Sequence, residues 1–350
     1  MLLPSAKGLP VNLLAACFNN TVATYKYYWL LAILQSVEAG HSRVLKQELF
    51  ARMISTAWYT VNYFHISFGK QDRLQRAIEV IKISEGLRIN ESQASISETL
   101  YKSNNTISLR HMRYFNNQVP HWFLSPWFPK MTSSQIYTES QKFSRQCLYG
   151  LYEDTVEINE EWIPYLKENI RVLKDFCYWN LSLFLQAKNP NVPDIPNKLI
   201  KPAVRNSLTN QRRNFWDIVL RELGSLECIY TGKRLTIGDY AVEHFIPYAF
   251  VSHDLIWNLV PADPSFNSSK RDKLPQLDKY FISFFSMQKL AFEIVCEKTP
   301  NNRYLEEYLT IFPDIEEFKN LSEIFTKDKF KERFQPLVTI ASNNGFEYMS

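Results

Sequence analysis

The stretch that decides the fold of this chain spans residues 243–275 and reads EHFIPYAFVSHDLIWNLVPADPSFNSSKRDKLP. Runs of strand-forming residues at Tyr240 to Phe245, and upstream at Cys228 to Tyr230, predict short strands. Asp263 is a favourable helix N-cap and Pro264 suits a first helical turn, so this pair predicts the start of a helix. Small strands and a short helix are therefore expected within one segment.

Helices are predicted on both sides of this segment. Upstream, apolar residues at helical spacing run from about Thr209 to Leu223, and Gly224 is the kind of residue that ends a helix. Downstream of Pro275, helical spacing returns at Tyr280, Phe284, Met287, Leu290 and Ile294. We therefore expect a small α+β segment enclosed by helices.

The first part of the chain is predicted to be helical. Residues 24–66 place apolar side chains at helical spacing, and a second long pattern begins at the cap residue Asn159 and continues through Phe184. Between them, residues 119–129 alternate prolines with aromatic residues, which predicts an extended connection. For these rings, packing against a core is favoured over stacking on unpaired bases.

A proline-rich segment marks the predicted boundary between two modules. Three prolines interrupt residues 188–197 and cannot continue a helix. We predict a helical scaffold or recognition domain over residues 1–190 and a second module over residues 198–350, with its α+β core at about 226–275. The expected fold class is α+β and mostly helical, with an all-α N-terminal domain.

Composition sets limits on partners and surroundings. The 350 residues include 40 basic and 36 acidic side chains, a net charge of +4, which tolerates a polyanionic partner without indicating one. The odd number of cysteines and the lack of any CxxC spacing favour neither disulfides nor thiolate zinc, and suggest a reducing cytoplasm. The densest apolar run, Tyr27 to Leu34, is too short for a membrane span, so no membrane association is expected. The cysteines are Cys17, Cys147, Cys177, Cys228 and Cys296.

Four residues follow the pattern of a known family: Glu243, His244, Asn258 and Asn267. The stretch resembles the HNH endonuclease family, in which an acidic–His pair ends one strand, a central Asn begins another, and a short helix brings back a last Asn or His. The spacing is most similar to the HNH domain of the RNA-guided CRISPR effector nucleases. Further matching positions are Pro247, Lys270, Asp272 and Pro275. The resemblance implies a ββα-metal module flanked by helices.

Residue chemistry agrees with the resemblance. Hydrolysis of a phosphodiester needs an activated water and a cation that neutralises charge at the phosphate. His244 can accept a proton near neutral pH. Glu243 and the side-chain oxygen of Asn267 are hard ligands suited to one Mg²⁺ or Mn²⁺ ion. We therefore predict that these three residues are catalytic, with Glu243 and Asn267 holding the metal.

The remaining motif residues receive supporting roles. The resemblance implies that Asn258 is structural and orients His244 by fixing the loop between the strands. Lys270 is three residues after Asn267 on the predicted helix, so it is expected to bind phosphate, with Arg271 and Lys273 extending that contact. The loop residue His253 is expected to be solvated.

Two departures from the family pattern are visible. Glu243 stands where Asp is commoner, which lengthens the reach of the proposed ligand by one methylene. Many HNH proteins bind a structural zinc through paired cysteines, whereas this segment offers only Cys228. No structural zinc is expected, and packing by the flanking helices should hold the module instead.

The function predicted from the sequence is a divalent-metal-dependent HNH endonuclease that hydrolyses DNA, in restriction or phage defence. One site would nick one strand, so a homodimer or a defence-system partner protein is a further expectation. Two alternatives stay open. The chain could be an RNA-cleaving HNH toxin or effector, or a nucleic-acid-binding or interaction protein whose HNH site is idle.

Overall fold

The structure is a computed structural model that describes residues 3–200, 207–320 and 323–350. The chain divides into two compact units. The first comprises Met1–Pro190 and Ile195–Ala203, and the second comprises Asn191–Asp194 and Val204–Ser350. The proline-rich segment at 188–197 is therefore where the chain first passes between units, although the helix at Ile195–Ile200 belongs to the first one.

The N-terminal unit is built around the helix α2. Its side chains are buried along almost its whole length, with Trp29, Leu30 and Ile33 fully inaccessible, because α3, α9 and α10 pack around it. The helices of this unit are α1 (Val11–Ala16), α2 (Tyr25–Glu38), α3 (Lys46–Asn62), α4 (Arg73–Ser84), α5 (Gln93–Lys102), α6 (Thr106–Tyr114), η1 (Phe115–Asn117), α7 (Pro120–Phe123), α8 (Ser133–Ser140), α9 (Trp162–Glu168), α10 (Ile170–Lys188) and α11 (Ile195–Ile200).

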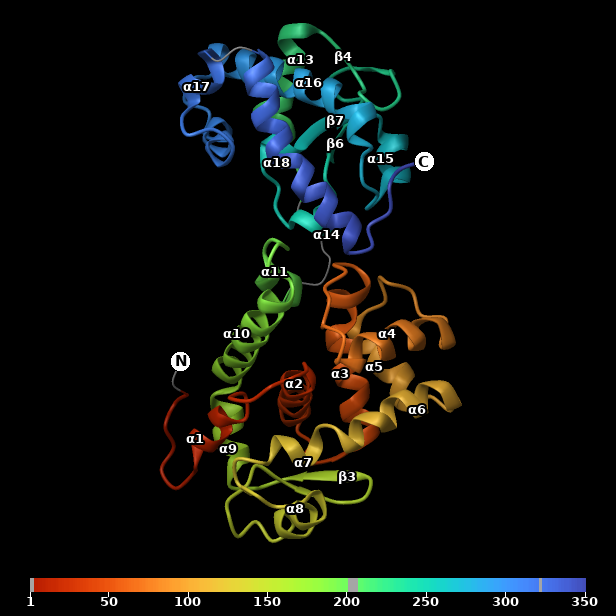
Figure 1. Cartoon of the computed structure of the whole chain (residues 1–350), viewed down its shortest axis with the longest axis vertical. Coiled ribbons are helices and arrows are strands. Elements are labelled where there is room, and N and C mark those ends of the chain that lie inside the picture. Colours follow the sequence, from red (N-terminus) through yellow and green to blue (C-terminus); the bar gives the residue numbers. More distant parts are fainter. Residues whose placement is uncertain (1–2, 201–206, 321–322) are drawn as a thin grey trace. The chain divides into compact units, whose positions relative to one another are not determined.

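A small sheet in this unit was not expected from the sequence. Strands β1 (Arg43–Leu45), β2 (Tyr149–Leu151) and β3 (Thr155–Ile158) form an antiparallel sheet in the order β1-β3-β2. It lies near α8 in Figure 1. The predicted α+β, mostly helical class is confirmed, but the N-terminal unit is not all-α. The sequence did not reveal these strands because strands this short carry little periodic signal.

The prediction for the aromatic segment at 119–129 was also wrong. It was expected to be extended, yet it forms the short helix α7 followed by turns. The packing role predicted for its rings is confirmed for most of them: Phe123, Trp127 and Phe128 are buried, while Trp122 is half exposed.

The C-terminal unit contains the predicted segment of strands and helices. Its helices are α12 (Thr209–Gln211), the π-helical η2 (Arg212–Trp216), α13 (Asp217–Leu223), α14 (Tyr248–Val251), η3 (Ile256–Asn258), α15 (Pro264–Lys270), α16 (Leu277–Lys298), η4 (Arg303–Thr310), α17 (Ile315–Asn320) and α18 (Glu323–Asn343). Its strands are β4 (Leu226–Glu227), β5 (Arg234–Leu235), β6 (Ala241–His244) and β7 (Leu259–Ala262). The predicted helix at about 209–223 is confirmed, and Gly224 ends it with a φ of 74°.

One predicted strand in this unit is wrong. Residues 228–230 form a turn after β4, in which the Gly232 amide donates to the Cys228 carbonyl. The strand itself lies two residues earlier and pairs antiparallel with β5.

The hairpin of β6 and β7 forms the centre of the unit. The two strands are antiparallel, with Glu243 opposite Val260 and His244 opposite Leu259. In Figure 1 they lie among α13, α15, α16 and α18. The ring of Phe245 stacks on Phe284 of α16, with 3.9 Å between their centroids, so the end of β6 is fixed against the aromatic core.

No membrane-spanning element is found in the described part of the chain. None of the helices within residues 3–200, 207–320 and 323–350 has both the length and the apolar character needed to cross a bilayer.

Candidate active site

His244 is the last residue of β6 and lies almost entirely below the surface, with 4% of its area exposed. Its Nε2 atom is 2.9 Å from Oδ1 of Asp254, and the edge of the Tyr248 ring faces the imidazole. The ring is therefore held by polar and aromatic neighbours. A purely apolar interior would disfavour the charged imidazolium that forms when the ring accepts a proton, and His244 is not in such surroundings.

Glu243 precedes His244 in the same strand and is also buried. Its Oε1 atom is 2.7 Å from Nζ of Lys270, and Nζ also donates to the carbonyl oxygen of His244 at 2.7 Å. Both side chains are buried. Burial, together with the neighbouring Glu243 carboxylate, raises the pKa of the Tyr230 phenol well above its ordinary value.

The position of Lys270 corrects its predicted role. The sequence predicted that Lys270 shares a helix face with Asn267 and binds a phosphate oxygen. Its side chain is instead wholly inaccessible, and its amine binds β6. A buried ammonium needs such a partner, because an unpaired charge in the interior costs several kcal/mol. Lys270 therefore joins α15 to β6 and does not present its charge to a ligand.

Asn258 fixes the long loop between the strands. Its Oδ1 accepts from the Ile246 amide and its Nδ2 donates to the Ile246 carbonyl, each at 2.9 Å, while its own carbonyl accepts from the Phe245 amide. The residue is fully buried. These contacts close both ends of the loop onto the end of β6, which is the arrangement that an orienting residue for His244 requires.

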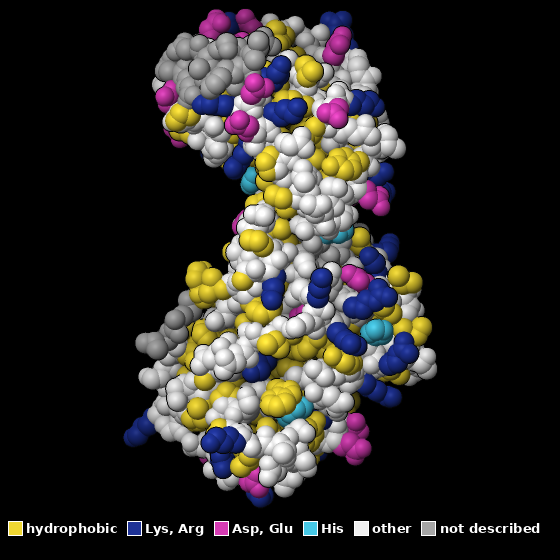
Figure 2. Space-filling view, in the orientation of Figure 1, with side chains coloured by type: hydrophobic (Ala, Val, Ile, Leu, Met, Phe, Trp, Pro, Cys, Tyr) yellow, Lys and Arg dark blue, Asp and Glu magenta, His cyan; other side chains and the backbone are white. Residues whose placement is uncertain are grey.

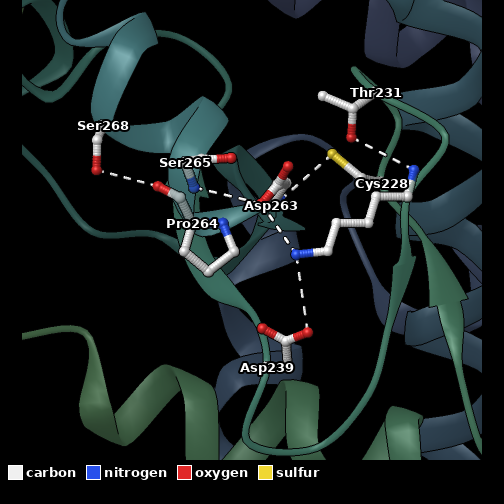
Figure 3. Close-up of polar contacts among 8 residues, drawn as sticks. Cys228, Thr231, Asp239, Asp263, Pro264, Ser265 and Ser268 are labelled. Carbon is white, nitrogen blue, oxygen red and sulfur yellow. Dashed lines mark hydrogen bonds and ion pairs between the residues drawn. The ribbon is translucent and has the colours of Figure 1, made fainter.

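Helix α15 carries Asn267 and is anchored at its first turn (Figure 3). Asp263 caps the helix by accepting from the Ser265 amide, as predicted, and its own amide donates to the sulfur of Cys228. The amine of Lys233 lies 3.3 Å from Asp263 and 3.7 Å from Asp239. Although desolvation acts the other way, the hydrogen bonds from Ser265 and Lys233 lower the pKa of Asp263. The turn after β4 is thus tied to the start of α15.

Asn267 carries a buried polar atom that nothing in the described part of the chain pairs. Its Oδ1 atom is buried and has no hydrogen-bond partner among the described residues. A buried amide oxygen without a partner is unfavourable unless something else satisfies it. The helix that bears it packs against β6, the strand of Glu243. An amide oxygen and a carboxylate are ligand types that Mg²⁺ or Mn²⁺ accepts. The Asn267 oxygen, unpaired within the described ranges, suits such an ion, whereas one oxygen of the Glu243 carboxylate is already held by the Lys270 amine.

The two other predicted phosphate ligands follow α15. Arg271 is exposed and Lys273 is half-buried. Neither side chain is hydrogen-bonded or ion-paired within the described ranges, so both charges are available to a ligand. Basic and acidic side chains are intermixed on the face of the C-terminal unit shown in Figure 2, which carries no continuous basic stripe there.

Two carboxylates near His244 were not found from the sequence. Asp254 holds the imidazole, and Glu307 of η4 accepts a hydrogen bond from the Ile256 amide. Burial raises the pKa of Glu307, and the charge of Asp254 adds to that effect. The neighbouring His253 was predicted to be solvated, but its ring packs against Trp257 and is only partly exposed. Glu307 is 51 residues from its partner, so no local pattern could have indicated it.

A polar cavity of about 630 Å³ opens beside these carboxylates. Asp254 and Glu307 line it together with Gln211, Arg303, Tyr304 and Glu306. Solvent therefore reaches the carboxylate that holds the histidine. The described residues contain no group of three or more His, Cys, Asp or Glu side chains arranged to bind a metal.

Comparison with known families agrees with this geometry. Residues 228–276, which include the β6–β7 hairpin and α15, match the HNH endonuclease family. This segment is an HNH-family domain. No curated protein and no solved structure matches the chain. The HNH domain indicates nuclease activity, and a nucleic acid is the substrate class that this family implies.

The buried pair predicts a specific stability effect. Lys270→Met should lower the free energy of unfolding by about 3–5 kcal/mol, because it leaves the Glu243 carboxylate buried without its cation. Urea unfolding measures the loss. Combining Lys270→Met with Glu243→Gln should recover much of it, since neither residue is then charged.

Lys273→Met is the matched control, because it removes a half-buried, unpaired amine close to the same helix. It should change stability by no more than about 0.5 kcal/mol. If Lys270→Met were as stable as the wild type but bound nucleic acid more weakly, the original phosphate-binding role would be restored.

Proposed function

We propose that this chain is a divalent-metal-dependent HNH endonuclease that hydrolyses phosphodiester bonds of DNA. The observation that carries the proposal is the unpaired, buried Oδ1 of Asn267 on α15, within an HNH-family segment whose first strand ends at His244. An idle HNH site would have no need to retain a buried amide oxygen without a partner on this helix.

The proposed reaction uses the imidazole of His244 as the base. A water molecule gives a proton to His244 while its oxygen forms a bond to phosphorus, and the bond from phosphorus to the leaving sugar oxygen breaks. The leaving oxygen takes a proton from solvent. Proton transfer of this kind contributes about 10² to 10⁴ in rate. Glu243 and Asn267 would hold the ion, whose charge would stabilise the phosphate oxygens in the transition state.

Three other side chains support this chemistry. Asn258 keeps the end of β6 in register with the loop, so that His244 keeps its position. Arg271 and Lys273 supply charge for the nucleic-acid backbone on the exposed side of α15. One site cuts one strand, so we propose that double-strand cleavage uses a homodimer or two successive nicks.

If His244 is the base, its loss should nearly abolish cleavage. Purified protein should nick supercoiled plasmid in the presence of Mg²⁺ or Mn²⁺ and not in EDTA, and His244→Ala should slow nicking by about 10² to 10⁴. His253→Ala is the matched control, because it removes a histidine from the loop that follows β6. Its activity should stay close to that of the wild type.

The same assay decides between the alternatives. Duplex DNA, single-stranded DNA and structured RNA are compared side by side, and DNA is expected to be cut fastest. Preferential cleavage of RNA would favour the RNA-cleaving effector. Equal nicking by the wild type and His244→Ala would remove this site from the reaction, and binding without any cleavage would favour an idle site.

If Asn267 is a metal ligand, its loss should weaken metal binding. Asn267→Ala removes one oxygen ligand, so the concentration of Mg²⁺ that gives half-maximal activity should rise by about tenfold or more, and added Mn²⁺ should partly restore activity. Direct Mn²⁺ binding, followed by electron paramagnetic resonance, should weaken in parallel. Ser268→Ala, an exposed change one residue along α15, is the control. Unaltered Mn²⁺ binding by Asn267→Ala would contradict the ligand assignment.

We propose host defence, in the form of restriction or resistance to phage, as the biological setting. A separate helical domain joined to an HNH domain resembles such effectors. All five cysteines are free thiols, which suits a reducing cytoplasm. Cells that produce the protein should support fewer phage plaques than cells that produce His244→Ala. Equal plaque counts, with nicking intact in vitro, would separate the enzymatic activity from this setting.

A further inference from the structure

We infer that Asp254 is a positioning residue, which holds the imidazole of His244 with its proton on Nε2 and leaves Nδ1 as the atom that accepts a proton from water. This inference rests on the proposed function, because it assigns the geometry of the same base. Asp254 lies between α14 and η3, and neither composition nor family pattern had marked it.

The atoms involved fix the tautomer. An ionised carboxylate can only accept hydrogen bonds, so the 2.9 Å contact between Nε2 of His244 and Oδ1 of Asp254 places the proton on Nε2. In the neutral imidazole the lone pair is then on Nδ1. Nδ1 has no hydrogen-bond partner in the described part of the chain. A base whose other nitrogen is held in this way keeps one orientation and one reactive atom.

Asp254 is itself fixed by its loop. Ser252 caps the end of helix α14 in a left-handed conformation with a φ of 57°, two residues before Asp254. Two residues after Asp254, the Ile256 amide donates to the half-buried carboxylate of Glu307, and the Ile256 carbonyl accepts from Gln288. A mobile loop would lose the contact with His244. This loop is held because both the amide and the carbonyl of Ile256 are hydrogen-bonded.

Besides Asn258, three further supports of this loop lie outside the segment that matches the HNH family. Gln288 belongs to α16 and Glu307 to η4, whereas the match ends at residue 276. Gln211 of α12, which precedes the match, donates to the Asp254 carbonyl at 3.4 Å. The helices that flank the HNH domain therefore complete its active site, and they act through the position of one carboxylate.

The groups that face this carboxylate are few. Arg303, Glu306 and Glu307 line the same polar cavity as Asp254. Glu306 is exposed and makes no contact with His244, so it offers a matched control with the same charge and the same cavity.

The first test is spectroscopic and needs no substrate. The protein is labelled with ¹⁵N-histidine, and the imidazole nitrogens are observed in EDTA at a pH where the rings are neutral. The His244 signals are assigned by their absence in His244→Gln. The wild type should show the Nε2–H tautomer, and Asp254→Ala should show a mixture of tautomers, whereas Glu306→Gln should resemble the wild type. An Nδ1–H tautomer in the wild type would overturn the inference, even if the Asp254 variant does not fold.

The second test is kinetic. Asp254→Asn should lower kcat for DNA nicking by about 10- to 100-fold, as loss of a group that orients a catalytic histidine does, with KM and the metal requirement unchanged. Glu306→Gln should keep kcat within about twofold. A fall in DNA affinity or metal affinity with unchanged kcat would mean that Asp254 acts on binding and would overturn the inference.

The two tests also separate this inference from the proposed function. If the wild type cleaves no nucleic acid yet shows the Nε2–H tautomer that depends on Asp254, the nuclease proposal fails while the positioning contact stands. If the wild type cleaves DNA and both the tautomer and kcat are insensitive to Asp254, the positioning role fails while the nuclease stands.

Discussion

The rest of the active site depends on the buried contact between Lys270 and the end of β6. One ammonium group meets the Glu243 carboxylate and the His244 carbonyl, and so joins the last turn of α15 to the strand that carries the proposed base. This contact ties the helix bearing Asn267 directly to the strand bearing His244. A charge pair in a dry interior has strict geometric requirements, so it fixes how the helix lies on the strand.

The long loop between the strands is held by a different device. Asn258 binds the backbone of Ile246 in both directions, and Glu307 and Gln288 hold the backbone of Ile256. Amide and carboxylate groups satisfy backbone atoms that no strand or helix would satisfy there. The loop can therefore be irregular in shape and still present Asp254 to the imidazole in one position. The helices surrounding the HNH domain thus hold the loop that carries Asp254.

Sequence reasoning was most successful where structure is set by nearby residues. The helix start at Asp263 and Pro264, the helix end at Gly224 and the long helix after Pro275 were all predicted, because caps and helical periodicity involve residues within a few positions of each other. It failed for the sheet of β1, β3 and β2, for the turn at 228–230 and for the helix at 120–123. In those places the elements are too short to show a period, and contacts with distant residues decide their form.

The sequence by itself determined that an acidic–His pair ends a strand ahead of a short capped helix bearing Asn267, and that helices enclose this segment. Only the tertiary structure decided what each charged side chain contacts. Lys270 lies 27 positions from Glu243, and Glu307 lies 51 positions from Ile256. The same lysine could have faced solvent or phosphate on an isolated helix. Packing of α15 against β6 removed water from its amine, and a buried charge must then take the partner that the neighbouring strand provides.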